Sequence, residues 1–167
     1  MGALDELVYL MEEAFRGTGI EETNETQSLL GNLRTVGEDA WRTPPPGGSR
    51  TIASIVLHIG SCKVMYADYA FGPAQRRWDD PSLVPWTDDD VPRDAAIDWL
   101  VAAHRDLMAH VEALSDDDLG RLRMTNWGEQ RETRWVLSTL MQHDVYHAGE
   151  INHVRALTRS DDRWKWA

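Results

Sequence analysis

The sequence has one cysteine, no excess of basic residues and no apolar run long enough to cross a membrane. Because Cys62 is the only thiol, a disulfide within the chain is excluded, and a lone cysteine at this size suits a reducing compartment. No run reaches the roughly 18 apolar residues of a membrane span. The N-terminal stretch MGALDELVYLMEEAF also has acids where a signal peptide needs a basic flank. We therefore expect a cytoplasmic protein without a membrane partner.

Basic residues are too few for a nucleic-acid-binding surface. Asp and Glu number 28 against 17 Lys and Arg, which gives a net charge of −11. Binding to a phosphate backbone normally needs a stripe of Lys and Arg, and the sequence shows none. Acidic runs such as TDDDV and SDDDL are typical of solvated loops and helix N-termini. We expect no nucleic-acid partner and a small-molecule substrate instead.

Tryptophan, by contrast, is abundant for a chain of 167 residues, with eight copies. Some of these rings are expected in the core, but five lie in loop-like or terminal sequence. An amphipathic ring in such sequence suits the wall of a pocket or an interface. These five are Trp78, Trp86, Trp127, Trp164 and Trp166.

Apolar residues at helical spacing organise the chain, which shows no internal repeat and no low-complexity segment. The predicted helices cover residues 3–15, with the pattern resuming over 29–41, and then residues 51–70, 93–114 and 133–159. A long connection over 72–92, rich in Pro and Asp, separates the second helix from the third, and the WGE run near residue 128 is consistent with a short β-hairpin. Such lengths predict an all-α fold: one domain over residues 1–167, built as a four-helix bundle with a long crossover between helices two and three and an extra short N-terminal helix.

The stretch LMQHDVYHAGEINHV, residues 140–154, carries three histidines. His143 and His147 are four residues apart, so they project side by side from one helix and can share a metal ion. Their face is otherwise apolar, which points them inward, where an imidazole pair without a partner would cost several kcal/mol. His153 lies off this face and is expected to be exposed.

A third ligand is needed for useful affinity, and His58 is the best candidate because it lies in the apolar helix TIASIVLHIGSCKVMY. Three histidines with an open fourth position are the arrangement of catalytic zinc, whereas structural zinc sites are closed and rich in Cys. Imidazole also suits other ions. We expect a divalent ion, zinc or nickel first, with iron, cobalt or manganese as alternatives.

Other residues near these histidines have two interpretations each. Cys62 is either a soft fourth ligand or a small buried apolar residue, and His104 is either a partner of the ligands or a hydrogen-bonded core histidine. Asp144 and Glu150 are candidates for proton acceptors, and Glu150 could instead hydrogen-bond an imidazole or lie on the surface. In HDVYH, an Asp stands where the H-E-x-x-H metalloproteases have their catalytic Glu, so that class is disfavoured.

The proline-rich break, the LHIG run and the run LMQHDVYHAGEINHVRAL together resemble the DinB/YfiT-like metalloenzyme superfamily over about residues 4–158. The most specific element is H-x3-H-x-G-x-I, matched by His143, His147, Gly149 and Ile151, with His58 matching the upstream histidine. The resemblance implies a four-helix bundle with a long crossover, a three-histidine metal site and frequent homodimers. Relatives include S-transferases and a maleylpyruvate isomerase that use a small thiol such as mycothiol or bacillithiol.

Two classes of function follow from this resemblance and from the histidines. In the first, the protein is an enzyme whose ion activates a small thiol for S-transfer, or activates water in a hydrolase variant. In the second, it is a non-catalytic metal-binding or stress-response protein, in which the ion joins two helices and the tryptophans form a dimer face. Access of solvent to the metal site discriminates between the two.

Overall fold

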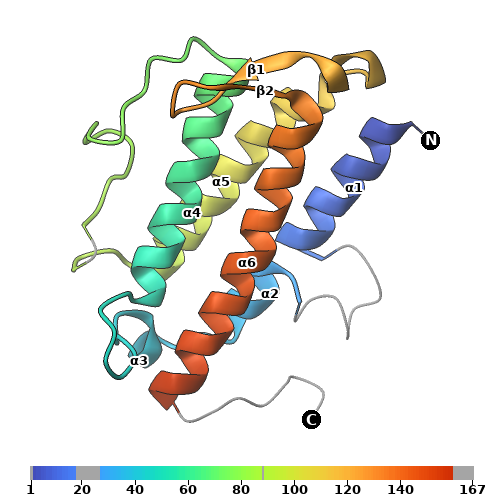
Figure 1. Ribbon diagram of the computed structural model, residues 1–167. Coiled ribbons are helices and arrows are strands. Elements are labelled where there is room, and N and C mark those ends of the chain that lie inside the picture. Colours follow the sequence, from blue (N-terminus) through green and yellow to red (C-terminus); the bar gives the residue numbers. More distant parts are fainter. Residues whose placement is uncertain (1, 18–26, 88, 160–167) are drawn as a thin grey trace.

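The computed structural model describes residues 2–17, 27–87 and 89–159 and shows a helical bundle with one small hairpin (Figure 1). Its elements are α1 (Ala3–Phe15), α2 (Leu29–Arg34), α3 (Glu38–Trp41), α4 (Ile52–Tyr66), the π-helical turn η1 (Ala67–Phe71), α5 (Arg93–Glu112), the 3₁₀ turn η2 (Asp116–Gly120), β1 (Leu122–Met124), β2 (Gln130–Glu132) and α6 (Thr133–Arg159). The predicted all-α class is confirmed. None of the described helices combines the length and the apolar character that a membrane crossing requires.

The long connection after η1 makes α4 and α5 parallel neighbours. In Figure 1 it returns along the whole length of the bundle, so that α5 starts at the same end as α4, while α1 and α6 run the opposite way. The predicted crossover between the second and third bundle helices is therefore confirmed. Its consequence for the site is that α4 lies beside the antiparallel α6.

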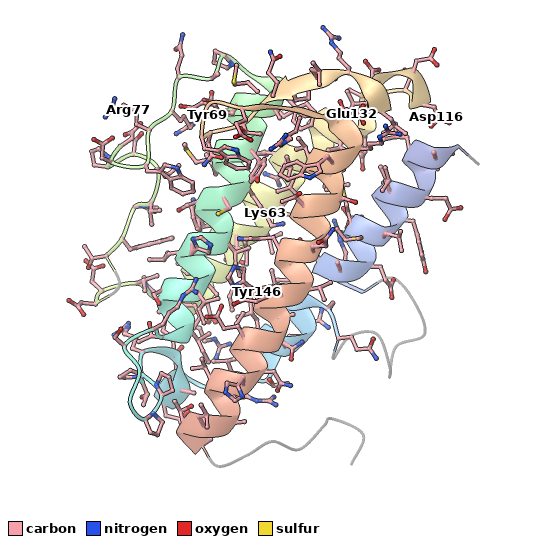
Figure 2. All side chains as sticks on the ribbon, in the orientation of Figure 1. Lys63, Tyr69, Arg77, Asp116, Glu132 and Tyr146 are labelled. Carbon is pink, nitrogen blue, oxygen red and sulfur yellow. The ribbon has the colours of Figure 1, made fainter. Side chains whose placement is uncertain are left out.

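Two short helices, α2 and α3, follow α1 where the sequence showed one continued apolar pattern. Ser28 caps α2 by accepting a hydrogen bond from the Gly31 N–H, and a separate helix, α3, starts after Gly37. The four bundle helices range from 13 residues in α1 to 27 in α6. The N-terminus of α1 is held by Asp116 (Figure 2), whose carboxylate accepts the Ala3 and Leu4 N–H groups.

The core consists of two apolar clusters with a layer of buried polar residues between them. One cluster holds the apolar residues of α4 up to Ile59 and of α6 from Ala148, and the other holds those of α4 from Tyr66 and of α6 up to Leu140. Lys63, His104 and Asp144 occupy the layer between, and each is nearly inaccessible to solvent. The histidines discussed below lie on α4 and α6 at the level of this layer.

The parallel helices α4 and α5 approach closely at Gly60. A Cβ atom built on Gly60 would come within 2.1 Å of the Trp99 ring, so only glycine leaves room for this tryptophan. Gly149, on the exposed side of α6, has open space where its Cβ would be.

We expect Gly60→Ala to lower the free energy of unfolding by about 1–3 kcal/mol, because Trp99 must move and strain its packing. Gly149→Ala is the matched control. It should leave stability unchanged or raise it by up to about 1 kcal/mol, since alanine favours the helix and nothing is displaced. Denaturation in urea measures both, and equal effects of the two substitutions would contradict this account of Gly60.

The predicted hairpin is present and lies across the ends of α4 and α6 (Figure 1). β1 and β2 pair in antiparallel register, and Gly128 turns the chain with φ +86°, which suits glycine. Thr125 stabilises the turn by donating its hydroxyl to the Glu129 carbonyl. The turn thereby places Trp127 against Tyr66 at the end of α4, with the ring centroids 5.9 Å apart.

Candidate metal centre

Three histidines from two helices converge at one point. His58 Nε2 on α4 lies 3.2 Å from His143 Nε2 on α6. His147, one turn further along α6, places its Nε2 3.1 Å from His143 Nε2. One nitrogen from each of the three residues falls within 4.8 Å of the other two. The structure thus brings together the three residues that the sequence indicated as ligands.

The group lies at the edge of the core and opens outward. His147 is 3% exposed, His143 is half-buried and His58 is exposed. The prediction that this face points inward is therefore correct for His147, but the site as a whole is not enclosed in the bundle. Tyr146, which lies on the outer side of α6 (Figure 2), packs edge-on against the His147 ring.

Glu150 determines which nitrogen of His147 carries a hydrogen. His147 Nδ1 lies 2.6 Å from Glu150 Oε2, and since a carboxylate only accepts, Nδ1 donates and Nε2 presents a lone pair to the other two histidines. Arg50 holds Glu150 from the other side, donating to Oε1 at 3.0 Å. This carboxylate thus orients the His147 ring, and a hydrogen bond to an imidazole is one of the roles considered for it from the sequence.

The histidines remain neutral at physiological pH, as metal binding requires. Burial, together with the neighbouring His147 and His58 rings, lowers the pKa of His143 to about 3. Burial and the nearby His58 and Arg50 lower the pKa of His147 to about 4, and burial and Arg50 also lower that of His58. Protons therefore compete with a cation for these nitrogens only in acid.

The donor set fits a divalent ion. Nitrogens about 2.0–2.1 Å from a tetrahedral zinc lie about 3.3 Å from one another, close to the 3.1 and 3.2 Å found between the Nε2 atoms. Neutral rings with lone pairs directed at one another repel unless a proton or a cation lies between them. A cation bound by all three Nε2 atoms removes this repulsion.

Asp144 is not part of this group. Its side chain turns into the core and accepts a hydrogen bond from Lys63 Nζ at 2.7 Å, with both side chains at most 3% exposed. Figure 2 shows Lys63 between α4 and α6. The role of proton acceptor that the sequence suggested for Asp144 therefore lacks support, because its carboxylate is enclosed in an ion pair.

The other candidates from the sequence occupy separate places. His104 is a core histidine, stacked on Phe15 and 3.3 Å from Glu12 Oε1. His153 is exposed, as expected. Cys62 lies one turn from His58, its Sγ 3.7 Å from Nε2, and burial raises the pKa of this thiol to about 11, so that it is neutral without a metal.

Sequence reasoning missed two residues of the site, Arg50 and Tyr146. Arg50 follows the proline-rich loop directly before α4, and no local pattern shows that it meets Glu150 on α6 across 100 positions.

Of the five tryptophans predicted to line a pocket or an interface, Trp86 packs against the core, and Trp78 and Trp127 are about half exposed. Trp164 and Trp166 lie outside the described residues, and the homodimer stays a prediction.

We expect Glu150→Ala to weaken metal binding about 10- to 100-fold, the usual cost of losing a carboxylate that orients a ligating histidine. Isothermal titration with zinc or cobalt measures the change. Asp79→Ala serves as a control, since this carboxylate pairs with Arg77 on the exposed connection. Unchanged affinity in Glu150→Ala would show that His147 keeps its orientation without the carboxylate.

The fold and the site define a class: a helical bundle in which α4 and α5 are parallel and a histidine triad is shared between α4 and the antiparallel α6. The sequence model of the DinB superfamily matches residues 21–151, and this stretch contains His58, His143, His147 and Glu150. The chain belongs to the DinB superfamily. No curated protein matches it.

Proposed function

We propose that this protein is a metal-dependent enzyme that transfers a small thiol to an electrophilic substrate. His58, His143 and His147 would hold one divalent ion. The proposal is supported by membership of the DinB superfamily and by the three converging nitrogens. The choice of reaction depends on what surrounds these nitrogens.

The observation that carries the proposal is the exposure of His58. A site that serves only stability is closed by four protein ligands, whereas a catalytic site keeps a position open for substrate. Here the described residues supply three clustered ligands, and one of these three rings reaches the surface. A small molecule can therefore approach from the outer side of α4 and α6.

The positions of the carboxylates favour a thiol over water as the nucleophile. Metal-dependent hydrolases commonly place a general base beside the metal-bound water, but Asp144 is paired with Lys63 in the core, and Glu150 is held by His147 and Arg50. A divalent ion, when bound, lowers the pKa of a coordinating thiol, so that no further base is required.

The residues of this chain would then bind and orient the reactants. The three histidines stay neutral and keep their lone pairs available, and Glu150 keeps the His147 ring in place. In the reaction, the thiol sulfur forms a bond to an electrophilic carbon, the leaving group departs with its electron pair, and the thiol proton passes to solvent. The thiol would be of low molecular weight, such as mycothiol or bacillithiol.

A second candidate function, a non-catalytic metal-binding protein, is supported by one observation. The ligands come from two helices, so an ion would also join α4 to α6. If joining the helices were its role, chelation would lower the melting temperature strongly, and no thiol transfer would be detected.

The test uses protein loaded in turn with zinc, nickel, cobalt, iron and manganese. Mycothiol or bacillithiol is added with monochlorobimane, and conjugation is followed by fluorescence. Turnover should exceed that of His147→Ala by at least about 100-fold, while His153→Ala, which alters an exposed histidine on the same helix, should match the wild type. Turnover equal to that of His147→Ala with every metal and both thiols would overturn the proposal.

A further inference from the structure

An aromatic cluster lies at the hairpin end of α4 and α6, outside the histidine group. Trp127 in the hairpin turn packs edge-on against Tyr66 of α4 and against Trp135 of α6, with ring centroids 5.9 and 6.1 Å apart. Tyr66 is buried, whereas Trp127 and Trp135 are 48% and 40% exposed. Two tryptophans with this much apolar surface in solvent are characteristic of a binding site.

One row of residues on each of the two helices leads from this cluster to the candidate metal centre. On α4, His58, Cys62 and Tyr66 follow at intervals of one turn, and Cys62 Sγ contacts the His58 ring. On α6, Trp135, Thr139 and His143 are spaced in the same way. Because α6 runs opposite to α4 (Figure 1), His143 lies at the His58 end of the α4 row and Trp135 at the Tyr66 end. His58 and Tyr66 are eight residues apart, about 12 Å along the helix axis.

The α4 row between the two ends carries no charged side chain. It consists of Cys62 and Tyr66, which are 7% and 8% exposed. Among the described residues, the Tyr66 hydroxyl forms no hydrogen bond, so it can donate to a bound molecule. The opposite end of the site is charged, because Arg50 and Glu150 lie there.

We propose that Tyr66, Trp127 and Trp135 form a subsite for an aromatic or other planar apolar group of the electrophilic substrate. The aromatic group would stack at this end of the site, with its electrophilic carbon directed along Cys62 toward the histidines. Small cellular thiols are polar and suit the end with Arg50 and Glu150. The position given to the electrophilic carbon rests on the proposed function, whereas binding of the aromatic group at the subsite can be tested by itself.

The first experiment measures binding without turnover. The affinity of 2-naphthol is measured by ligand-observed NMR for the wild type, Trp127→Ala, Trp127→Phe and Trp78→Ala. Trp78 is the matched control, because it is 49% exposed and lies on the connection between α4 and α5. Affinity should fall about tenfold in Trp127→Ala, return to within about threefold of the wild type in Trp127→Phe, and stay unchanged in Trp78→Ala.

The second experiment measures thiol transfer to two electrophiles, planar bicyclic monochlorobimane and small iodoacetamide. Trp127→Ala should raise KM for monochlorobimane about tenfold more than it raises KM for iodoacetamide, whereas Trp78→Ala should change neither constant. Naphthol binding that depends on Trp127, in a protein without thiol transfer, would keep the subsite and reject the proposed reaction. Naphthol binding that is absent, or equal in Trp127→Ala and the wild type, would overturn the subsite whatever the activity.

Discussion

Replacing His147 by alanine should weaken the binding of zinc or cobalt by more than about 100-fold. Loss of a residue that only orients a ligand already costs 10- to 100-fold, and this substitution removes a ligand itself. It also leaves Glu150 without its imidazole partner. The wild type should bind one equivalent of metal, since only one group of three metal-ligating side chains lies within the described residues.

Titration calorimetry and the visible spectrum of the cobalt protein measure this loss. Metal at 1,000 times its Kd should stabilise the wild type by about 4 kcal/mol and raise its melting temperature, whereas His147→Ala should show almost no shift. His153→Ala controls for the loss of any histidine on α6, because His153 is exposed. Equal affinity and stoichiometry in the wild type and His147→Ala would remove the case for a metal centre.

Lys63→Met should lower the free energy of unfolding by about 3–5 kcal/mol, the largest stability effect we expect from a single substitution. The substitution keeps an unbranched apolar side chain that is one atom shorter and leaves the Asp144 carboxylate buried without its cation. Asp144 cannot find another partner easily, because its Oδ1 atom is already buried without a hydrogen bond among the described residues. Lys63 also lies over the Phe15 ring, so a contact to α1 is lost as well.

Urea denaturation measures this cost, and two controls separate it from general effects. The double variant Lys63→Met with Asp144→Leu removes both charges and should recover most of the lost stability, since apolar replacement of a whole buried pair is often neutral. Arg77→Ala breaks an exposed ion pair with Asp79 and should leave stability almost unchanged. A Lys63→Met effect as small as that of Arg77→Ala would show that the core pair is not coupled.

The helices and the histidine pair could be predicted because they depend on local spacing. The period of apolar residues defined the helix that contains His58 and the one that contains His143 and His147, and the i, i+4 interval alone places the latter two side by side. Gly128 in the WGE run indicated the hairpin for a similar reason, since its turn is formed by adjacent residues.

The roles of the two acids could not be predicted, because each depends on a distant partner. Asp144 stands directly after His143, yet its position on the helix turns it toward Lys63 of α4, 81 residues away. Glu150 lies near the same ligand face and meets both His147 and Arg50. Helical spacing gives the direction of a side chain, but not what it meets there.

The sequence by itself determined the helical class, the long crossover and the three histidines, because periodicity, link length and residue type are properties of the chain. Only the tertiary structure decided that the histidine group opens to solvent, that Asp144 is enclosed in the core, and that an aromatic cluster lies two turns from His58. The physical reason is that exposure and ion pairing depend on how α4, α6 and the hairpin pack, and no local interval in the sequence encodes their relative placement.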